Sequence, residues 1–315
     1  MQREHESAAT LIVAAIIDAV AGEPPACIHP VVGLGKLIQC AEQFRPHDNP
    51  RRELAWGVGV VAAIPAIAAL VSCALGRMLR PCPAWLRITI RGCILSTLAS
   101  WRMLDRAVAA VHDQLKVRDI DSAREKLSWL VSRDRSDLST SEIVAASIES
   151  IAENTSDSIV APLMAYWAFG LTGCAAYRAI NTLDAMIGYH GEYEYAGKPS
   201  AKIDDVVNFV PARVTAALIA CVQAHHRDSL HVAVSDHDLT ESPNAGWPMS
   251  AMAGALNVTL SKPGHYALNP NGREPEAADL NTSRRIVRRT AVLAVILAAT
   301  AMLLQGRTNR QLTDG

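Results

Sequence analysis

The sequence has few charged residues, few aromatic residues and no cysteine motif. Charged residues make up 19% of its 315 positions and aromatic residues 5%, whereas half of the positions are apolar. Soluble proteins average about a quarter charged. A net charge of −1 without a concentrated basic face excludes nucleic acid as the main partner. Seven cysteines without a C-x-x-C pair argue against a disulfide framework or a zinc knuckle.

The signatures of several common enzyme classes are also missing. The chain contains no G-x-S-x-G, no H-E-x-x-H and no G-x-G-x-x-G that opens a strand-to-helix turn. The turn around Gly33, Gly35 and Lys36 lacks the spacing of a P-loop. Any catalytic chemistry must therefore come from a different set of side chains.

Long uncharged runs are the strongest feature that is present. Residues 54–76 form 23 consecutive positions without a charge, enough for a helix to cross a hydrocarbon core of roughly 30 Å. Further spans are expected at 159–177, 206–224 and 290–306. Shorter stretches at 8–22 and 88–101 contain Asp18 and Arg91, and we expect them to be partly buried or re-entrant. The pattern predicts an all-α, multi-pass membrane helix bundle, formed by 1–315 as a single integral membrane domain.

Two polar insertions separate the apolar segments, at 102–157 and 225–289. Four arginines precede the last apolar segment and two follow it, so the positive-inside tendency places the second insertion in the cytoplasm. The first insertion has the pattern of amphipathic helix. In it, Ser139 and Glu142 form the S-x-x-E capping box and predict a helix that starts near Thr140 and runs through Ile159. Residues 178–205, rich in glycine, tyrosine and charge, are interpreted as a structured loop.

The densest group of chemically active side chains lies on that predicted helix. Glu149, Glu153 and Asp157 are spaced i, i+4, i+8, which places three carboxylates along one helical face. A solvated acidic stripe is one interpretation. The alternative is a polar cavity at the mouth of a membrane bundle, where Mg²⁺ and nucleotide phosphates would remove the repulsion between the carboxylates.

A second group combines carboxylates with basic residues. Asn181 and Asp184 lie one turn apart on a helix, so they could share a cation, and the adjacent pair Asp204 and Asp205 follows. Basic side chains that could clamp phosphate oxygens alternate with them: Arg178, Lys202 and Arg213. Asp205, Asn208 and Arg213 lie inside or beside an apolar segment, where unpaired polar groups are costly, which favours a function over a solvated loop.

A third group lies in the stretch LSKPGHYALNPNGREPE at residues 260–276. Gly264, Asn271 and Gly272 suit tight turns. Lys262, His265 and Arg273 could contact an anion, although an ordinary surface loop explains the stretch equally well.

A family resemblance rests on blocks that occur in order from Gly22 to Glu276. They are GEPP with HPVV, LVSRD, SIESIAENTSDSIVAPL, RAINTLDAMIGY, KIDDVVNFVPAR and PGHYALNPNGREPE. In these blocks the chain resembles the adenosylcobinamide-phosphate synthase family of cobalamin biosynthesis. One departure is SKPGHY, where an Arg-Pro version is more usual; Lys262 would still supply positive charge.

The resemblance implies a multi-pass protein of the cell inner membrane that joins adenosylcobyric acid to an aminopropanol phosphate by ATP-dependent amide ligation. It implies ATP and Mg²⁺ as cofactors, the lipid bilayer as surroundings, and association with other cobalamin-assembly membrane enzymes. We expect Glu149, Glu153 and Asp157, with Asn181 and Asp184, to hold Mg²⁺. The expected phosphate-binding residues are Arg178, Lys202, Arg213, Lys262, His265 and Arg273, and the expected catalytic residues are Glu153, with Asp204 or Asp205 as base.

One geometric difficulty accompanies this hypothesis. A straight spanning helix over 159–177 would rise roughly 28 Å and place the first two groups on opposite membrane faces. We therefore expect that segment to be tilted, broken near Gly170 and Gly173, or packed inside the bundle. Two rival functions stay open: a Mg²⁺-dependent intramembrane prenyl transferase, suggested by the paired acids, and a non-enzymatic corrinoid-binding membrane protein.

Overall fold

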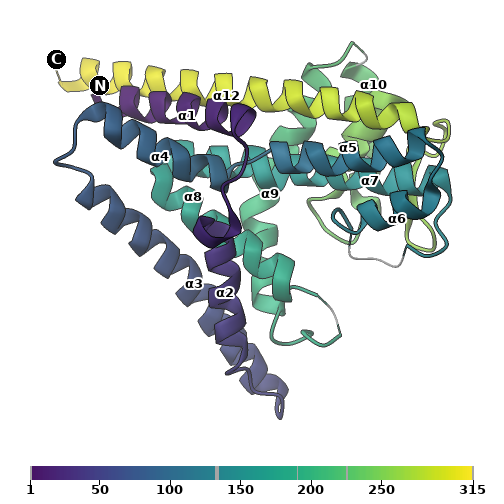
Figure 1. Ribbon diagram of the computed structural model, residues 1–315, viewed down its shortest axis with the longest axis horizontal. Coiled ribbons are helices and arrows are strands. Elements are labelled where there is room, and N and C mark those ends of the chain that lie inside the picture. Colours follow the sequence, from purple (N-terminus) through teal and green to yellow (C-terminus); the bar gives the residue numbers. More distant parts are fainter. Residues whose placement is uncertain (1, 132–134, 190, 225, 314–315) are drawn as a thin grey trace. The chain divides into compact units, whose positions relative to one another are not determined.

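The computed structural model describes residues 2–131, 135–189, 191–224 and 226–313. Apart from one short hairpin, the regular structure of these residues is helical (Figure 1), which confirms the all-α prediction. The chain forms two compact units. Unit 1 comprises Met1–Ser100, Ala161–Val207 and Val295–Gly315, and unit 2 comprises Trp101–Val160 and Asn208–Ala294.

Unit 1 is built from four complete N-terminal helices, a short 3₁₀ turn and α8. Its elements are α1 (Gln2–Val20), η1 (Ala26–Ile28), α2 (Pro30–Glu42), α3 (Pro50–Met78), α4 (Ala84–Leu98) and α8 (Ala161–Ile187). It also holds the first part of α9 (Lys198–Cys221) and the last part of α12 (Ala277–Thr313), because these two helices contribute to both units.

Three helical stretches among the described residues are long and apolar enough to cross a membrane. They are Pro50–Met78, Thr140–Ile187 and Ala277–Gly306. These stretches contain the predicted spans 54–76, 159–177 and 290–306. The fourth predicted span, 206–224, falls largely on α9, which is not among the three. The membrane character of the chain therefore rests on α3, on α8 with the helix before it, and on α12.

Helix packing in unit 1 sets the position of the C-terminal end of α8. Helices α1 and α4 run side by side (Figure 1), and Gly92 allows their close approach, because a β-carbon there would lie 2.7 Å from Val13 Cγ1. A second apolar core joins α2, α3 and α8. Its buried members are Ile38, Val60, Ile64, Ala179, Leu183 and Ile187. The side chains of Ala179, Leu183 and Ile187 lie on one face of α8 and are buried in this core.

Unit 2 surrounds one buried helix. Its elements are α5 (Arg102–Lys116), α6 (Ile120–Leu127), α7 (Thr140–Thr155), η2 (Ser156–Val160), α10 (His226–Asp236), η3 (His237–Leu239), α11 (Gly246–Leu256), β1 (Leu260–Lys262) and β2 (Tyr266–Leu268). Helices α5, α6 and α11 and strand β1 all pack on α7. Arg284 in α12 binds Asp105 in α5 through two hydrogen bonds of 2.8 Å, which ties α12 to this group.

The hairpin in unit 2 has the turn chemistry that its sequence predicts. Strands β1 and β2 pair antiparallel, with Lys262 opposite Tyr266. Between them Gly264 has φ of 77°, and the His265 N–H donates to the Lys262 carbonyl at 2.9 Å. A Pro-Gly pair at the two central positions is typical of a type II turn. Within the described ranges this hairpin is the one sheet, and an isolated bridge joins Val258 to Arg273.

The interpretation of 178–205 as a loop was wrong at both ends. Helix α8 continues to Ile187 and α9 begins at Lys198, so only the residues between them leave helical structure. The helix continues past residue 178, where composition predicted a loop, because one face of α8 is buried in the core of unit 1. Packing of an apolar face outweighs local composition here.

Candidate functional site

The candidate site residues divide between the two units. Unit 1 holds Arg178, Asn181, Asp184, Lys202, Asp204 and Asp205. Unit 2 holds Glu149, Glu153, Asp157, Asn208, Arg213, Lys262, His265 and Arg273.

Helix α7 begins where its capping box predicts. Ser139 Oγ accepts the Glu142 N–H at 3.3 Å, and Glu142 Oε2 accepts the Ser139 N–H at 2.8 Å. These two bonds satisfy backbone donors that the first helical turn cannot pair internally. The capping box therefore fixes where α7 begins, and with it the direction in which each carboxylate leaves the helix axis.

The carboxylates of α7 do not form a solvated stripe. Glu149 is 6% exposed, and Glu153 and Asp157 are half-buried. The residues around Glu149, from Ile143 to Ala152, are all buried. A buried carboxylate is costly unless it is paired or binds a ligand. Burial thus removes the simplest non-functional explanation for these acids.

A π-helical turn interrupts the helix directly after α7. Residues Ser156–Val160 form this turn, with Asp157 inside it. The regular i, i+4 spacing therefore holds for Glu149 and Glu153, while the wider turn changes the direction of Asp157. The helix predicted from Thr140 through Ile159 is continuous, but its last turn is π-helical rather than α-helical. Single π turns within helices occur frequently at functional sites.

The first charged pair on α8 has an internal partner. Arg178 Nη1 donates to Asn181 Oδ1 at 3.2 Å, so the amide oxygen expected to bind a cation accepts a hydrogen bond from the residue expected to bind phosphate. Both side chains are half-buried. The interaction holds the guanidinium beside the next turn of α8.

Two aspartates from different helices lie close together in unit 1. Asp184 on α8 and Asp205 on α9 are near enough for their charges to interact. Asp184 follows Leu183, whose side chain is buried in the core of unit 1 and so sets the orientation of this turn of α8. Burial raises the pKa of Asp205 above its ordinary value. The structure thus brings together an expected metal ligand and an expected base.

The neighbours of Asp205 on α9 differ sharply in exposure. Asp204 is 9% exposed and Asn208 2% exposed, whereas Lys202 is exposed. Lys202 can therefore meet a solvent-borne anion. Asp204 and Asn208 are buried, where a polar group is costly unless it has a hydrogen-bonding partner.

Arg213 lies against two aromatic rings in unit 2. Its guanidinium carbon is 3.5 Å from the Phe209 ring centroid and 4.9 Å from the Trp247 centroid. Nη1 also donates to the Phe209 carbonyl at 2.6 Å. The His237 ring stacks on Trp247 with centroids 4.0 Å apart. Aromatic contacts therefore orient Arg213 and leave further donors of its guanidinium for a phosphate.

The third predicted group does not gather into one anion site. Arg273 donates to both carboxylate oxygens of Asp279, at 2.6 and 2.8 Å, and these bonds raise the pKa of Arg273. His265 Nδ1 lies 3.3 Å from Glu241 Oε1. Lys262 is half-buried in β1. Two of the three residues thus have acidic partners, and their roles in phosphate binding stay predictions.

A divalent ion bound to these residues would also need ligands from water and from substrate phosphates. No group of three or more His, Cys, Asp or Glu side chains among the described residues could hold a metal ion by itself. Mg²⁺ usually takes one or two carboxylates and completes its octahedron with water and substrate phosphates. The neighbouring Asp184 and Asp205, or the half-buried acids of α7, match that pattern.

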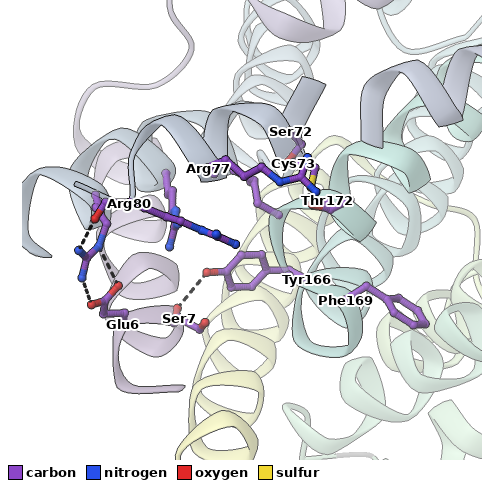
Figure 2. Close-up of a pocket in the computed structure, with 14 residues that line it drawn as sticks. Glu6, Ser7, Ser72, Cys73, Arg77, Arg80, Tyr166, Phe169 and Thr172 are labelled. Carbon is purple, nitrogen blue, oxygen red and sulfur yellow. Dashed lines mark hydrogen bonds and ion pairs between the residues drawn. The ribbon is translucent and has the colours of Figure 1, made fainter. Parts of the chain in front are cut away.

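Sequence reasoning missed a cavity in unit 1 that contains none of these residues. Its lining includes Arg77, Arg80, Arg87 and Arg91 (Figure 2). In the sequence these arginines gave no orientation, because the apolar segment 54–76 has four basic residues on each side. Four arginines in one stretch between two apolar segments were the available signal.

Comparisons with known proteins agree over nearly the whole chain. The family model described as "CobD/Cbib protein" matches residues 11–296. A "Cobalamin biosynthesis protein CobD" of Rhodobacter capsulatus is 38% identical over 94% of this chain and 98% of its own. One of Dehalococcoides mccartyi is 35% identical over 91% and 94%, respectively. A "Probable cobalamin biosynthesis protein CobD" of Pyrococcus furiosus is 36% identical over 94% and 99%. No solved structure matches the chain.

Proposed function

Because this chain belongs to the CobD/Cbib protein family, we propose that it is the ligase that makes adenosylcobinamide phosphate. It would join adenosylcobyric acid to (R)-1-amino-2-propanol phosphate, or a related amino alcohol phosphate, as a multi-pass protein of the inner membrane. The observation that supports the proposal is the burial of Glu149, next to the half-buried acids Glu153 and Asp157.

The chemistry requires activation of a carboxylate, since a carboxylate is a poor acceptor for an amine. A corrinoid carboxylate oxygen attacks the γ-phosphorus of ATP, and ADP leaves. The amine then attacks the resulting acyl carbon, inorganic phosphate leaves, and an amide remains. Mg²⁺, when bound, supplies charge neutralisation at the phosphates. Glu149, Glu153 and Asp157 in unit 2, or Asn181 and Asp184 in unit 1, are the proposed residues that would hold it.

The proposed roles of the other residues follow from their charge and burial. Arg178, Lys202 and Arg213 would bind phosphate oxygens and stabilise the negative charge that develops during transfer. Asp205, or its neighbour Asp204, would take the proton from the attacking ammonium. A base with a raised pKa is closer to the operating pH, which supports Asp205.

The direct test uses the chain purified in detergent with a corrinoid acid, aminopropanol phosphate and Mg-ATP. We expect an amide product by mass spectrometry, with release of phosphate that depends on both substrates. Glu153→Gln should abolish product formation, while Glu125→Gln on the exposed surface of α6 should leave it unchanged. Wild-type turnover by the Glu153→Gln protein would remove Glu153 from the mechanism.

The same preparation separates the rival functions. Turnover of a labelled prenyl diphosphate without amide product would indicate a prenyl transferase, for which the close pair Asp184 and Asp205 would bind diphosphate through Mg²⁺. Corrinoid binding without ATP consumption would indicate a non-enzymatic carrier. Either result would overturn the ligase proposal.

A further inference from the structure

A cavity of about 750 Å³ lies among four helices of unit 1. Helices α1, α3, α4 and α8 and the segment that follows α3 surround it. Its lining consists of Glu6, Ser7, Ser72, Cys73, Gly76, Arg77, Arg80, Arg87, Arg91, Tyr166, Phe169, Gly170, Leu171 and Thr172. Figure 2 shows Tyr166 directed toward Ser7, and the Phe169 ring turned away from both.

The charge of this lining is strongly positive. Four arginines and one glutamate leave three excess positive charges, counting 4 − 1 = 3. Glu6 is already engaged, because Arg87 binds both of its carboxylate oxygens. Arg87 also donates to the Cys82 carbonyl at 2.8 Å. The one acid of the cavity therefore serves to hold Arg87 in place.

The other three arginines have no acidic partner in the part of the chain that the structure describes. Arg77 and Arg80 are exposed, and Arg91 is half-buried. The Arg91 side chain lies near Gly76 of α3, where a β-carbon would be 4.0 Å from Arg91 Nη2. Like charges gathered around one space repel each other, and a bound anion removes that repulsion. Guanidinium groups are suited to phosphate, whose oxygens they can bind in pairs.

A break in α8 adds a second feature that favours an anion. Gly170 has φ of 67° and ψ of −160°, which is not helical, so the residues after it start a new helical segment. Leu171 and Thr172, in the first turn of that segment, line the cavity. The first turn of a helix carries backbone N–H groups without internal acceptors and the positive end of the helix dipole. Tyr166, one turn before the break, donates to the Ser7 carbonyl at 3.2 Å and closes the cavity floor.

Exposed apolar side chains belong to the cavity lining or adjoin it in the sequence. Phe169 is 76% exposed, and on the neighbouring turn of α3 Leu70 and Val71 are 66% and 64% exposed. These positions belong to, or adjoin, helices that are long and apolar enough to cross a membrane. A group that places a phosphate among the arginines can therefore extend an apolar tail over α3 and α8. Basic pockets between membrane helices bind phospholipid head groups by this arrangement.

We propose that the cavity lined by Arg77, Arg80 and Arg91 binds a phosphate group, carried by an anionic phospholipid or by a free phosphate ester. Arg87, fixed by Glu6, and the start of the second α8 segment complete the site. The site is separate from every residue assigned to ligation, and its occupancy is measured by binding alone. Failure of the ligase proposal would leave it standing, and the reverse holds as well.

The test compares two double variants that lose the same charge. Arg80→Gln with Arg91→Gln removes two cavity arginines, and Arg51→Gln with Arg52→Gln removes two at the far end of α3. Native mass spectrometry of the full chain in detergent measures binding of phosphatidylglycerol and of phosphatidylcholine with the same acyl chains. Thermal unfolding in inorganic phosphate, against chloride at equal ionic strength, measures binding of free phosphate.

We expect the cavity variant to lose about tenfold or more in affinity for one phosphate probe, and the α3-end variant to retain it. A loss confined to phosphatidylglycerol identifies a lipid as the ligand, and a loss confined to inorganic phosphate identifies a soluble phosphate ester. If the cavity double variant does not fold, Arg77→Gln alone should weaken the same probe by about threefold, because Arg77 is exposed and its loss leaves packing intact. Three results would overturn the proposal. The first is equal binding by wild type and the cavity variants, and the second is an equal loss in the α3-end variant. The third is a wild type that binds phosphatidylglycerol no better than phosphatidylcholine and is stabilised no more by phosphate than by chloride.

Discussion

Arg273 binds both carboxylate oxygens of Asp279 just as the chain enters α12, with bonds of 2.6 and 2.8 Å. The Asp279 side chain is 8% exposed, and it also accepts the Glu276 N–H at 2.8 Å. This geometry makes Arg273 a structural residue at the start of the last helix, whatever further role it has with phosphate.

The Arg273 and Asp279 pair yields a first prediction about stability. Asp279→Ala should lower the free energy of unfolding by about 1–2 kcal/mol, because it leaves a helix start without its acceptor and the guanidinium without its partner. A double-mutant cycle with Arg273→Ala should show a coupling energy of about 1 kcal/mol. Thermal and chemical unfolding in detergent measures both values. A coupling near zero would mean that the ion pair contributes nothing in solution.

The break at Gly170 yields a prediction about backbone conformation. The surrounding space is open, since a β-carbon added at this position would have no atom within 4 Å, so Gly170→Ala tests φ alone. We expect a loss of about 1–3 kcal/mol, because side chains disfavour this region of backbone space. Gly59→Ala is the matched control: its β-carbon would also meet no atom, but it lies within α3. There alanine should stabilise by up to about 1 kcal/mol. Equal melting temperatures for both variants would count against a fixed break.

Asp205 yields a prediction about the pH dependence of ligation. The base must be deprotonated to act, and burial raises its pKa. Activity should therefore fall as the pH drops through a midpoint that lies above the pKa of an ordinary aspartate, roughly 3.9. The profile of kcat/KM against pH measures this acid limb. Asp205→Asn should lose about 10²–10⁴ in rate together with the limb. Asp121→Asn, on the exposed surface of α6, should keep both. An unchanged limb in the Asp205→Asn protein would transfer the role to another residue.

The capping box of α7 yields a fourth prediction. Ser139→Ala removes the acceptor for the Glu142 N–H and should lower the free energy of unfolding by about 1 kcal/mol. Glu142→Gln retains an acceptor for the Ser139 N–H and should have less than half of that effect. Unfolding curves of the two proteins provide the comparison. A larger loss for Glu142→Gln would show that the charge of Glu142 matters more than its hydrogen bond.

Part of the candidate site could be predicted because it depends on neighbours along the chain. Glu149 and Glu153 share a helical face through spacing alone, and Ser139 marks the start of that helix through a bond to the next turn. Of the three alternatives expected for 159–177, the structure shows a break at Gly170, where glycine tolerates backbone angles that other residues disfavour. The π turn at Ser156–Val160 was missed, because its sequence continues the same helical pattern.

Pairings between residues of different structural elements could not be predicted. Arg273 was expected to bind phosphate, yet Asp279 takes two of its donors. Asp184 and Asp205 were expected to act separately, yet the fold places them near enough for their charges to interact. Their positions depend on which faces of the helices are buried, and that choice is made by the whole core of unit 1.

By itself, the sequence determined the helical class, the apolar stretches, the family and the start of α7. Each of these follows from composition or from interactions within a few turns, where free energies depend on residues that the chain already holds close. Only the tertiary structure decided that the α7 acids are shielded, that Asp184 meets Asp205, and that arginines from α3, α4 and the segment between them surround one cavity. These outcomes depend on packing between helices that are far apart in the chain. Burial of their apolar faces also positions the polar side chains beside those faces.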